Sequence, residues 1–128
     1  MVLDNHLVTY PNLRVASVEN AAQFLPDLFR KARSLSHKIP GWFREDPVDI
    51  MRGQVWINPF WEDDVMEVVE HMGADRVLFG SDWPHIEGMP QPLDYLPEVK
   101  ALEPDERRLV LHDNAVELIG PPSPATGR

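Results

Sequence analysis

The sequence predicts an α/β fold with parallel strands, and three observations support this prediction. Predicted strands alternate with predicted helices along the chain, an order that produces parallel strands joined by right-handed crossovers. The segments between the predicted strands each exceed the dozen or so residues that a crossover requires. Two of the predicted strands end at an acidic residue, Glu19 and Asp82. Carboxylates at the carboxyl ends of buried parallel strands lie where α/β proteins place catalytic groups.

The first predicted strand covers residues 13–19, where Val15 and Val18 give an apolar pattern. Asn20 is a residue type that favours a helix N-cap, so we expect a helix from residue 21 to about residue 36. Its apolar side chains recur at helical spacing, as expected for a helix with one buried face: Phe24, Leu25, Leu28 and Phe29.

The middle of the chain predicts a short helix, a second strand and a longer helix. Asp46-Pro47 is a typical helix opening, and the short helix is expected over residues 47–51. The second strand is expected over residues 54–58, where Pro59 ends it. A helix over residues 61–72 follows, and Gly73 is a favourable C-terminal stop.

The third predicted strand covers residues 76–81 and contains the apolar run Val77-Leu78-Phe79. An irregular loop is expected over residues 84–92. Helices are then expected over residues 93–102 with an interruption at Pro97, over residues 104–111, and over residues 114–119. Residues 1–120 would form one partial domain, and residues 121–128 a disordered tail.

Composition limits the classes of function. The chain has 128 residues and a net charge of −9, which disfavours nucleic acid and anionic membrane surfaces as partners. No stretch approaches the roughly 18 apolar residues of a membrane span. There is no cysteine, and the first residues lack the pattern of a signal peptide. These features favour a cytoplasmic protein.

Residues 76–85, with the sequence RVLFGSDWPH, are the most informative segment. They resemble the last barrel strand of the amidohydrolase superfamily, and in particular the amidohydrolase-related group that includes aminocarboxymuconate-semialdehyde decarboxylase. Asp113-Asn114-Ala115 resembles a triplet near the C-terminus of many members. The resemblance implies the C-terminal portion, about strands 6–8 with their helices, of a (β/α)8 TIM barrel. A complete barrel takes roughly 250 residues, so this chain would supply about half.

Asp82 is the strongest candidate for chemistry. In the resembling family, the aspartate that closes the last strand ligates a divalent metal or takes a proton from metal-bound water. The resemblance therefore implies that Asp82 is a metal ligand and general base. The alternative is that Asp82 only caps the turn before Trp83-Pro84, as aspartates before turns often do.

Three further residues are expected to line a substrate pocket. His85 would orient substrate or a carboxylate at the pocket mouth, although an exposed loop histidine is an equal alternative. Trp83 would shape the rim of the barrel. Asn58, which follows the second strand, would donate to a substrate carbonyl or carboxylate. An ordinary turn role before Pro59 is the simpler reading of Asn58.

Glu19 marks a departure from the resembling family. Where the decarboxylase-like members end the matching strand in a histidine, this chain has Val18-Glu19-Asn20-Ala21. The departure suggests a different reaction within the family. Glu19 would act as a general base if burial raised its pKa, and the alternative is a carboxylate at the start of a helix.

The family's other metal ligands are missing. A catalytic zinc needs about three protein ligands, and the family supplies a His-x-His pair and a further histidine. This sequence contains no His-x-His. Zinc is the expected metal of a complete enzyme, while activity of this chain alone is not expected.

Two classes of function remain open. The first is the C-terminal part of a metal-dependent enzyme that hydrolyses or decarboxylates a small carboxylic or aromatic-derived compound. The second is a catalytically incomplete fragment or interaction module. Three strands of a barrel leave open edges and apolar faces, so the chain is expected to pair with an N-terminal barrel half, to form homo-oligomers or to aggregate.

Overall fold

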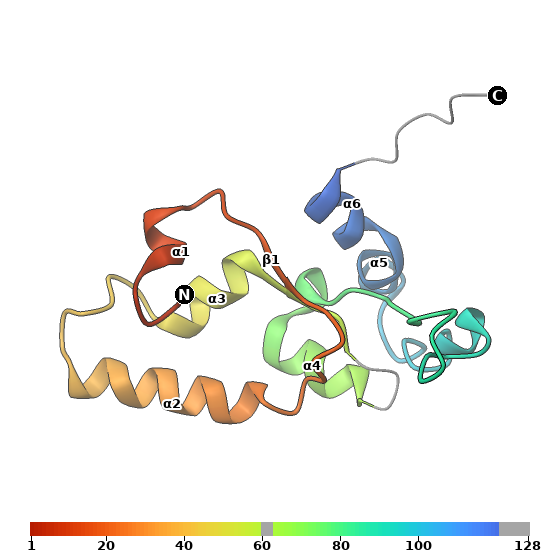
Figure 1. Ribbon diagram of the computed structural model, residues 1–128, viewed down its shortest axis with the longest axis horizontal. Helices are drawn as coiled ribbons and strands as arrows, with labels where there is room; N and C mark the ends of the chain where they lie inside the picture. The colour runs from red at the N-terminus through yellow and green to blue at the C-terminus, as the bar shows by residue number, and fades with distance from the viewer. Residues whose placement is uncertain (60–62, 121–128) are drawn as a thin grey trace.

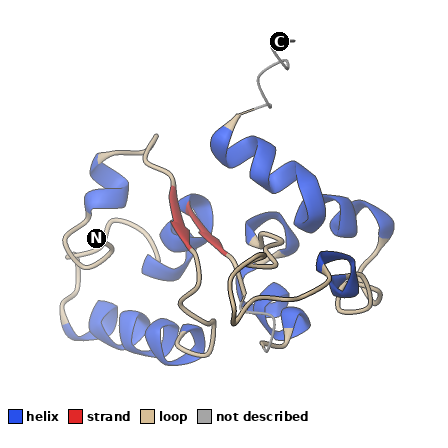
Figure 2. Ribbon diagram, turned by 45° about the vertical axis from the view of Figure 1, so that its right-hand side comes forward, coloured by secondary structure: helices blue, strands red, loops and turns tan. Residues whose placement is uncertain are grey.

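A two-stranded parallel sheet joins the two halves of the molecule in a computed structural model, which describes residues 1–59 and 63–120. Strand β1 (Val15–Ser17) pairs with β2 (Val55–Ile57), with Val15 opposite Val55 and Ser17 opposite Ile57. Figure 1 shows the sheet between helices α1 to α3 on one side and α5 and α6 on the other, and Figure 2 shows the two strands at the centre. The chain is thus an α/β fragment with parallel strands, as expected.

The third predicted strand is reduced to a single bridge, so the prediction of a strand over residues 76–81 is wrong in extent. Val77 forms an isolated parallel bridge to Ile57, and Leu78 N–H donates to the Ile57 carbonyl at 2.8 Å. Arg76 belongs to the short 3₁₀ turn η1 (Ala74–Arg76). Phe79 N–H then donates to the Val110 carbonyl at 2.9 Å, so the backbone leaves the ladder for a helical partner.

Helix α2 (Leu25–Lys38) begins later than its apolar pattern predicted. Glu19 and Ala21 have positive φ angles of 60° and 52°, a conformation that cannot belong to a right-handed helix. Asn20 is therefore not the N-cap. Its side-chain amide donates instead to the Val18 carbonyl at 2.9 Å.

Helix α3 (Pro47–Gln54) is longer than predicted and takes up the first residue of the expected second strand. Its N-cap is Asp46, whose carboxylate accepts from Val48 N–H at 2.8 Å. Helix α4 (Val65–Met72) begins after Asp64, whose side chain caps it, and ends at Gly73. The predicted start of this helix at residues 61 and 62 lies outside the described residues.

The C-terminal third contains one clear error and one confirmed helix. The helix predicted over residues 93–102 is wrong, because only the 3₁₀ turn η2 (Pro92–Tyr95) and further turns occur there. Helix α5 (Pro104–Arg108) runs through a π-helical turn, η3 (Leu109–Asp113), into α6 (Asn114–Ile119), which was predicted with these bounds. The short helix α1 (His6–Thr9) was not predicted. The predicted tail over residues 121–128 lies outside the described part.

One apolar core connects these elements. Buried side chains from α2, α3, α4, β2 and the segment after η1 form a single cluster, which includes Leu25, Phe29, Val48, Ile57, Val68 and Val77. Tyr95 joins this core from η2, and its ring meets that of Phe79 edge-on at 4.8 Å between centroids. No helix in the described ranges is long and apolar enough to cross a membrane.

Candidate metal and substrate site

Asp82 lies in a loop that folds back on itself directly after the Val77 bridge. Asp82 adopts a positive φ of 54°, which aspartate tolerates better than most residues. His85 N–H donates to the Asp82 carbonyl at 2.8 Å, and Met89 N–H donates to the Ser81 carbonyl at 2.7 Å. These bonds close the loop and fix the position from which the Asp82 side chain projects.

Gly88 is needed for this loop because of close approach. A Cβ atom at Gly88 would lie 2.5 Å from the Asp82 carbonyl oxygen and 2.9 Å from the Ser81 carbonyl oxygen. Both contacts are with backbone, which cannot move aside as a flexible side chain can. The role of Gly88 was not predicted from the sequence. The available signal was a glycine six residues after the strand-end aspartate Asp82.

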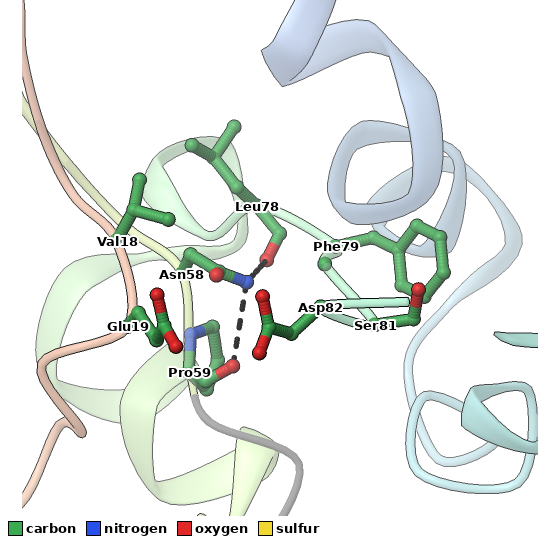
Figure 3. Close-up of a pocket in the computed structure, with 9 residues that line it drawn as sticks. Val18, Glu19, Asn58, Pro59, Leu78, Phe79, Ser81 and Asp82 are labelled. Atoms are coloured by element: carbon green, nitrogen blue, oxygen red, sulfur yellow. Dashed lines mark hydrogen bonds between the residues drawn. The ribbon is translucent and has the colours of Figure 1, made fainter. Parts of the chain in front are cut away.

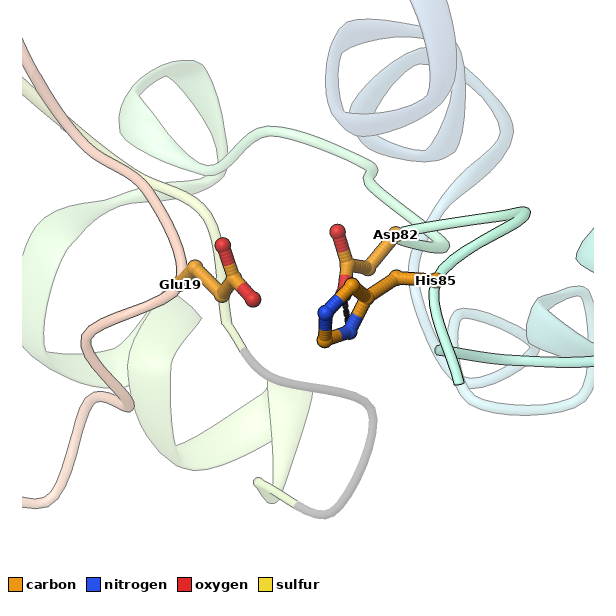
Figure 4. Close-up of side chains that lie close together, drawn as sticks. All are labelled: Glu19, Asp82 and His85. Carbon is orange, nitrogen blue, oxygen red and sulfur yellow. Dashed lines mark ion pairs between the residues drawn. The ribbon is translucent and has the colours of Figure 1, made fainter. Parts of the chain in front are cut away.

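Glu19 reaches the same place from β1. It lies two residues beyond the strand, is exposed, and has a positive φ of 60°. For glutamate this left-handed conformation costs about 1 kcal/mol. Figure 4 shows the Glu19 carboxylate directed across the gap toward Asp82 and His85.

The structure brings Glu19, Asp82 and His85 together. One ligand atom from each lies within 4.8 Å of the others. The shortest separation joins His85 Nδ1 and Asp82 Oδ2 at 3.2 Å. The geometry therefore places together three residues that the sequence had proposed for one pocket, while their roles remain predictions.

Asp82 Oδ2 is a buried oxygen without a hydrogen-bond partner among the described residues. It lies at ion-pair distance, 3.2 Å, from His85 Nδ1. Glu87 N–H also points at this nitrogen, at 3.4 Å.

A cavity of about 210 Å³ opens beside the two carboxylates (Figure 3). Asn58 lines it, and its side-chain amide donates to the Leu78 carbonyl at 3.2 Å and the Pro59 carbonyl at 3.3 Å. The amide nitrogen of Asn58 thus holds the end of β2 against the segment after Val77. The walls are otherwise mostly apolar and include Val18, Pro59, Leu78 and Phe79.

Trp83 lies apart from this cavity. Its side chain is 63% exposed and is absent from the cavity lining. Its backbone N–H donates to the Ser81 hydroxyl at 3.3 Å. Trp83 therefore does not line the pocket in the described part of the chain, and its contact with substrate stays a prediction.

Asn114 is a positioning residue that the sequence indicated only by the resemblance of its triplet. It is fully buried, and its amide donates to the Ala74 and Val77 carbonyls, each at 2.7 Å. These bonds tie α6 to the segment that leads to Asp82. Asn114 therefore acts on the site through the backbone and not through contact with it.

Tyr95 is the described residue near the cavity whose pKa is clearly displaced. Burial raises the pKa of its phenol well above the usual range, and the charges of Glu98 and Asp63 add to the effect. The hydroxyl is buried and has no hydrogen-bond partner in the described ranges. Tyr95 thus stays protonated and supports Phe79 by packing.

The donor set of the three clustered residues fits a divalent cation. Two carboxylates and one imidazole are ligands that first-row divalent metals accept. Asp82 Oδ2 is buried and has no hydrogen-bond partner among the described residues, and a cation would compensate for this. The three residues are therefore a candidate divalent-cation site beside a parallel α/β framework.

Comparison with known proteins identifies the family. The family model described as Amidohydrolase matches residues 2–120, and the chain belongs to this family. The family generally uses a divalent metal. No curated protein matches the chain.

A solved structure supports the same assignment. The chain resembles a crystal structure of an amidohydrolase from Mycobacterium avium subsp. paratuberculosis K-10, with 36% sequence identity and a TM-score of 0.88. The match covers 92% of this chain and 31% of that one. The chain thus spans about a third of that amidohydrolase, and its fold is that of a segment of a TIM-barrel family.

Proposed function

We propose that this chain forms the Asp82 side of the active site in a metal-dependent amidohydrolase, as its C-terminal part of about strands 6–8. The reaction is hydrolysis or decarboxylation of a small carboxylic or aromatic-derived compound, in the manner of the aminocarboxymuconate-semialdehyde decarboxylase group. The observation that carries the proposal is the buried Asp82 Oδ2, which has no hydrogen-bond partner among the described residues. A cytoplasmic location is consistent with the composition and remains a prediction.

The residues of the cavity have separate roles in this proposal. Asp82 holds the metal or receives a proton at Oδ2, and Glu19 acts as a second base from the facing loop. Asn58 orients the substrate from the cavity wall, and His85, which lies beside Asp82 but outside the cavity lining, orients it from the Asp82 loop. A bound divalent metal, most simply zinc, would supply Lewis-acid polarisation of a substrate oxygen and an activated water. The apolar walls exclude bulk water from the reacting group.

The test replaces Asp82 when the segment is part of a complete barrel. Asp82→Asn is expected to abolish turnover and to reduce the bound metal, while the circular dichroism spectrum stays unchanged. Asp75→Asn is the matched control, because Asp75 is an exposed aspartate in η1, outside the cavity lining. Retention of both metal and turnover in Asp82→Asn would show that Asp82 only caps its turn.

A second candidate function is docking to a partner. Ile86 is 93% exposed and Leu93 is 76% exposed, and both lie in the loop region after Asp82. Such side chains favour burial against another polypeptide, which would be an N-terminal barrel half or a second copy. A sizing-column profile that shifts with concentration supports self-association, and a stable monomer at high concentration contradicts it.

A further inference from the structure

We propose that Glu19 determines substrate specificity, and that the cavity beside it takes a single ring carrying a cationic or N–H-donating group. The proposal rests on the proposed function and narrows it, because it favours an aromatic-derived compound without a carboxylate at this end of the cavity. Glu19 receives the N–H group of the substrate, and Asp82 keeps its proposed role. The sequence alone had suggested only a general base at Glu19.

The first step is the balance of charge between the two carboxylates. Asp82 Oδ2 lies 3.2 Å from His85 Nδ1, so Asp82 has a partner that can carry positive charge. Glu19 forms no hydrogen bond or ion pair with any other residue in the described ranges. Figure 4 shows its carboxylate directed across the gap toward Asp82. The carboxylate that is left to a ligand is therefore that of Glu19, and a cationic or N–H group is its natural partner.

The second step is the kind of polar group that lines the cavity. The amide nitrogen of Asn58 already donates to the Leu78 and Pro59 carbonyls, so its side-chain oxygen, an acceptor, remains for a ligand. Glu19 and Asp82 add two carboxylates, and the lining contains no lysine, arginine or histidine among the described residues. A substrate carboxylate at this end would meet like charge, whereas an N–H group would find acceptors.

The third step is the size and polarity of the rest of the cavity. Its volume is about 210 Å³, and a cavity of about 150 Å³ suffices for benzene. Figure 3 shows apolar side chains around the polar end, from Val18, Pro59, Leu78 and Phe79. Apolar walls with a few polar groups at one end are typical of sites for small organic ligands. The cavity therefore fits one ring with one short polar substituent.

The experiment compares three single-ring probes that differ in their polar group. Benzylamine, which is protonated at neutral pH, benzyl alcohol and benzoate are each titrated into the 128-residue chain in the presence of a chelator, and amide NMR signals are followed. Because Glu19 is exposed and solvent screens its charge, we expect benzylamine to bind about fivefold more tightly than benzoate. The shifted signals should belong to residues 18–19, 58–59 and 78–82, which line the cavity.

A substitution separates the role of Glu19 from that of the walls. Glu19→Gln keeps the size of the side chain and should lower the affinity for benzylamine about fivefold, while the affinity for benzyl alcohol stays unchanged. Glu70→Gln is the matched control, because Glu70 is an exposed glutamate of α4 outside this cavity lining, and it should bind all three probes like the unchanged chain.

Three outcomes overturn the proposal: benzoate binds as tightly as benzylamine, Glu19→Gln binds benzylamine unchanged, or no probe shifts the cavity signals. None of them affects the turnover and metal content of Asp82→Asn in a complete barrel, which test the proposed function. A preference for benzoate would overturn the role of Glu19 and support the carboxylic substrate of the proposed function instead.

Discussion

The two loops that carry the acids of the site are held in different ways. The loop after β1 places Glu19 through local backbone geometry. Its residues are exposed, and its side-chain hydrogen bond is local, from the Asn20 amide to the Val18 carbonyl. The loop after Val77 places Asp82 through bonds to distant parts of the chain. Asn114 fixes the Val77 carbonyl from α6, and Phe79 N–H binds the Val110 carbonyl.

This difference means that the Asp82 loop has a fixed position, whereas the Glu19 loop can change its position. A position determined by several long-range contacts moves little when a ligand binds, and a position set by an exposed loop can adapt. Asp82 is therefore the fixed side chain of the cluster, and Glu19 is the side chain that can adapt. Four substitutions test this comparison.

Loss of the Asn114 amide should have the largest effect. Asn114→Ala leaves two buried carbonyls, those of Ala74 and Val77, without their donors and creates a small cavity. We expect the free energy of unfolding to fall by about 3 kcal/mol in denaturant titrations. Asn20→Ala is the matched control in the Glu19 loop and should change the free energy of unfolding by less than about 0.5 kcal/mol. Equal effects of the two changes would contradict the comparison.

Crowding of the Asp82 loop comes next. Gly88→Ala introduces a methyl group against the Asp82 and Ser81 backbone, and we expect a loss of about 2 kcal/mol with displaced NMR signals for residues 81–89. Gly53→Ala is the control, because its added Cβ would meet nothing within 4 Å. An unchanged midpoint for Gly88→Ala would show that the loop adapts as readily as the one carrying Glu19.

Relief of backbone strain at Glu19 should have the opposite sign. Glu19→Gly removes the cost of a positive φ, and we expect the free energy of unfolding to rise by about 1 kcal/mol while the carboxylate is lost. Glu19→Ala also removes the carboxylate but keeps the strain, so it serves as the control. If both variants have the stability of the unchanged chain, the strain is absent in solution.

The sequence predicted the architecture better than the details of the loops. Alternating strands and helices, the α6 bounds and the grouping of Glu19 with Asp82 follow from periodicity and from where polar residues interrupt apolar runs. The late start of α2 could not be predicted, because Asn20 suits an N-cap and nothing local shows that Glu19 and Ala21 adopt positive φ. The short third strand depends on the pairing of Phe79 N–H with Val110, a partner far away in the chain.

The candidate site shows the same limit. The sequence assigned Glu19, Asp82 and His85 to one pocket, but spacing along the chain gave no distances between the loop after β1 and the later loop. The close approach of His85 to Asp82 results from a loop closed by Gly88, whose role depends on backbone contacts. Packing contacts of this kind are visible only in three dimensions.

The smallest effect should come from Tyr95, which tests whether packing alone supports the Asp82 side. Tyr95→Phe removes a buried hydroxyl without a partner among the described residues, so stability at neutral pH should change by less than about 1 kcal/mol. Burial raises the phenol pKa in the folded chain, so above about pH 10 only the unfolded chain loses this proton. The free energy of unfolding therefore falls as pH rises through that region, and Tyr95→Phe should reduce the slope. Tyr10→Phe is the control, because the Tyr10 side chain is 59% exposed, and it should leave the stability at neutral pH unchanged. A large loss of stability in Tyr95→Phe at neutral pH would mean that the hydroxyl has a partner in solution, and that a hydrogen bond helps to hold the Asp82 side in place.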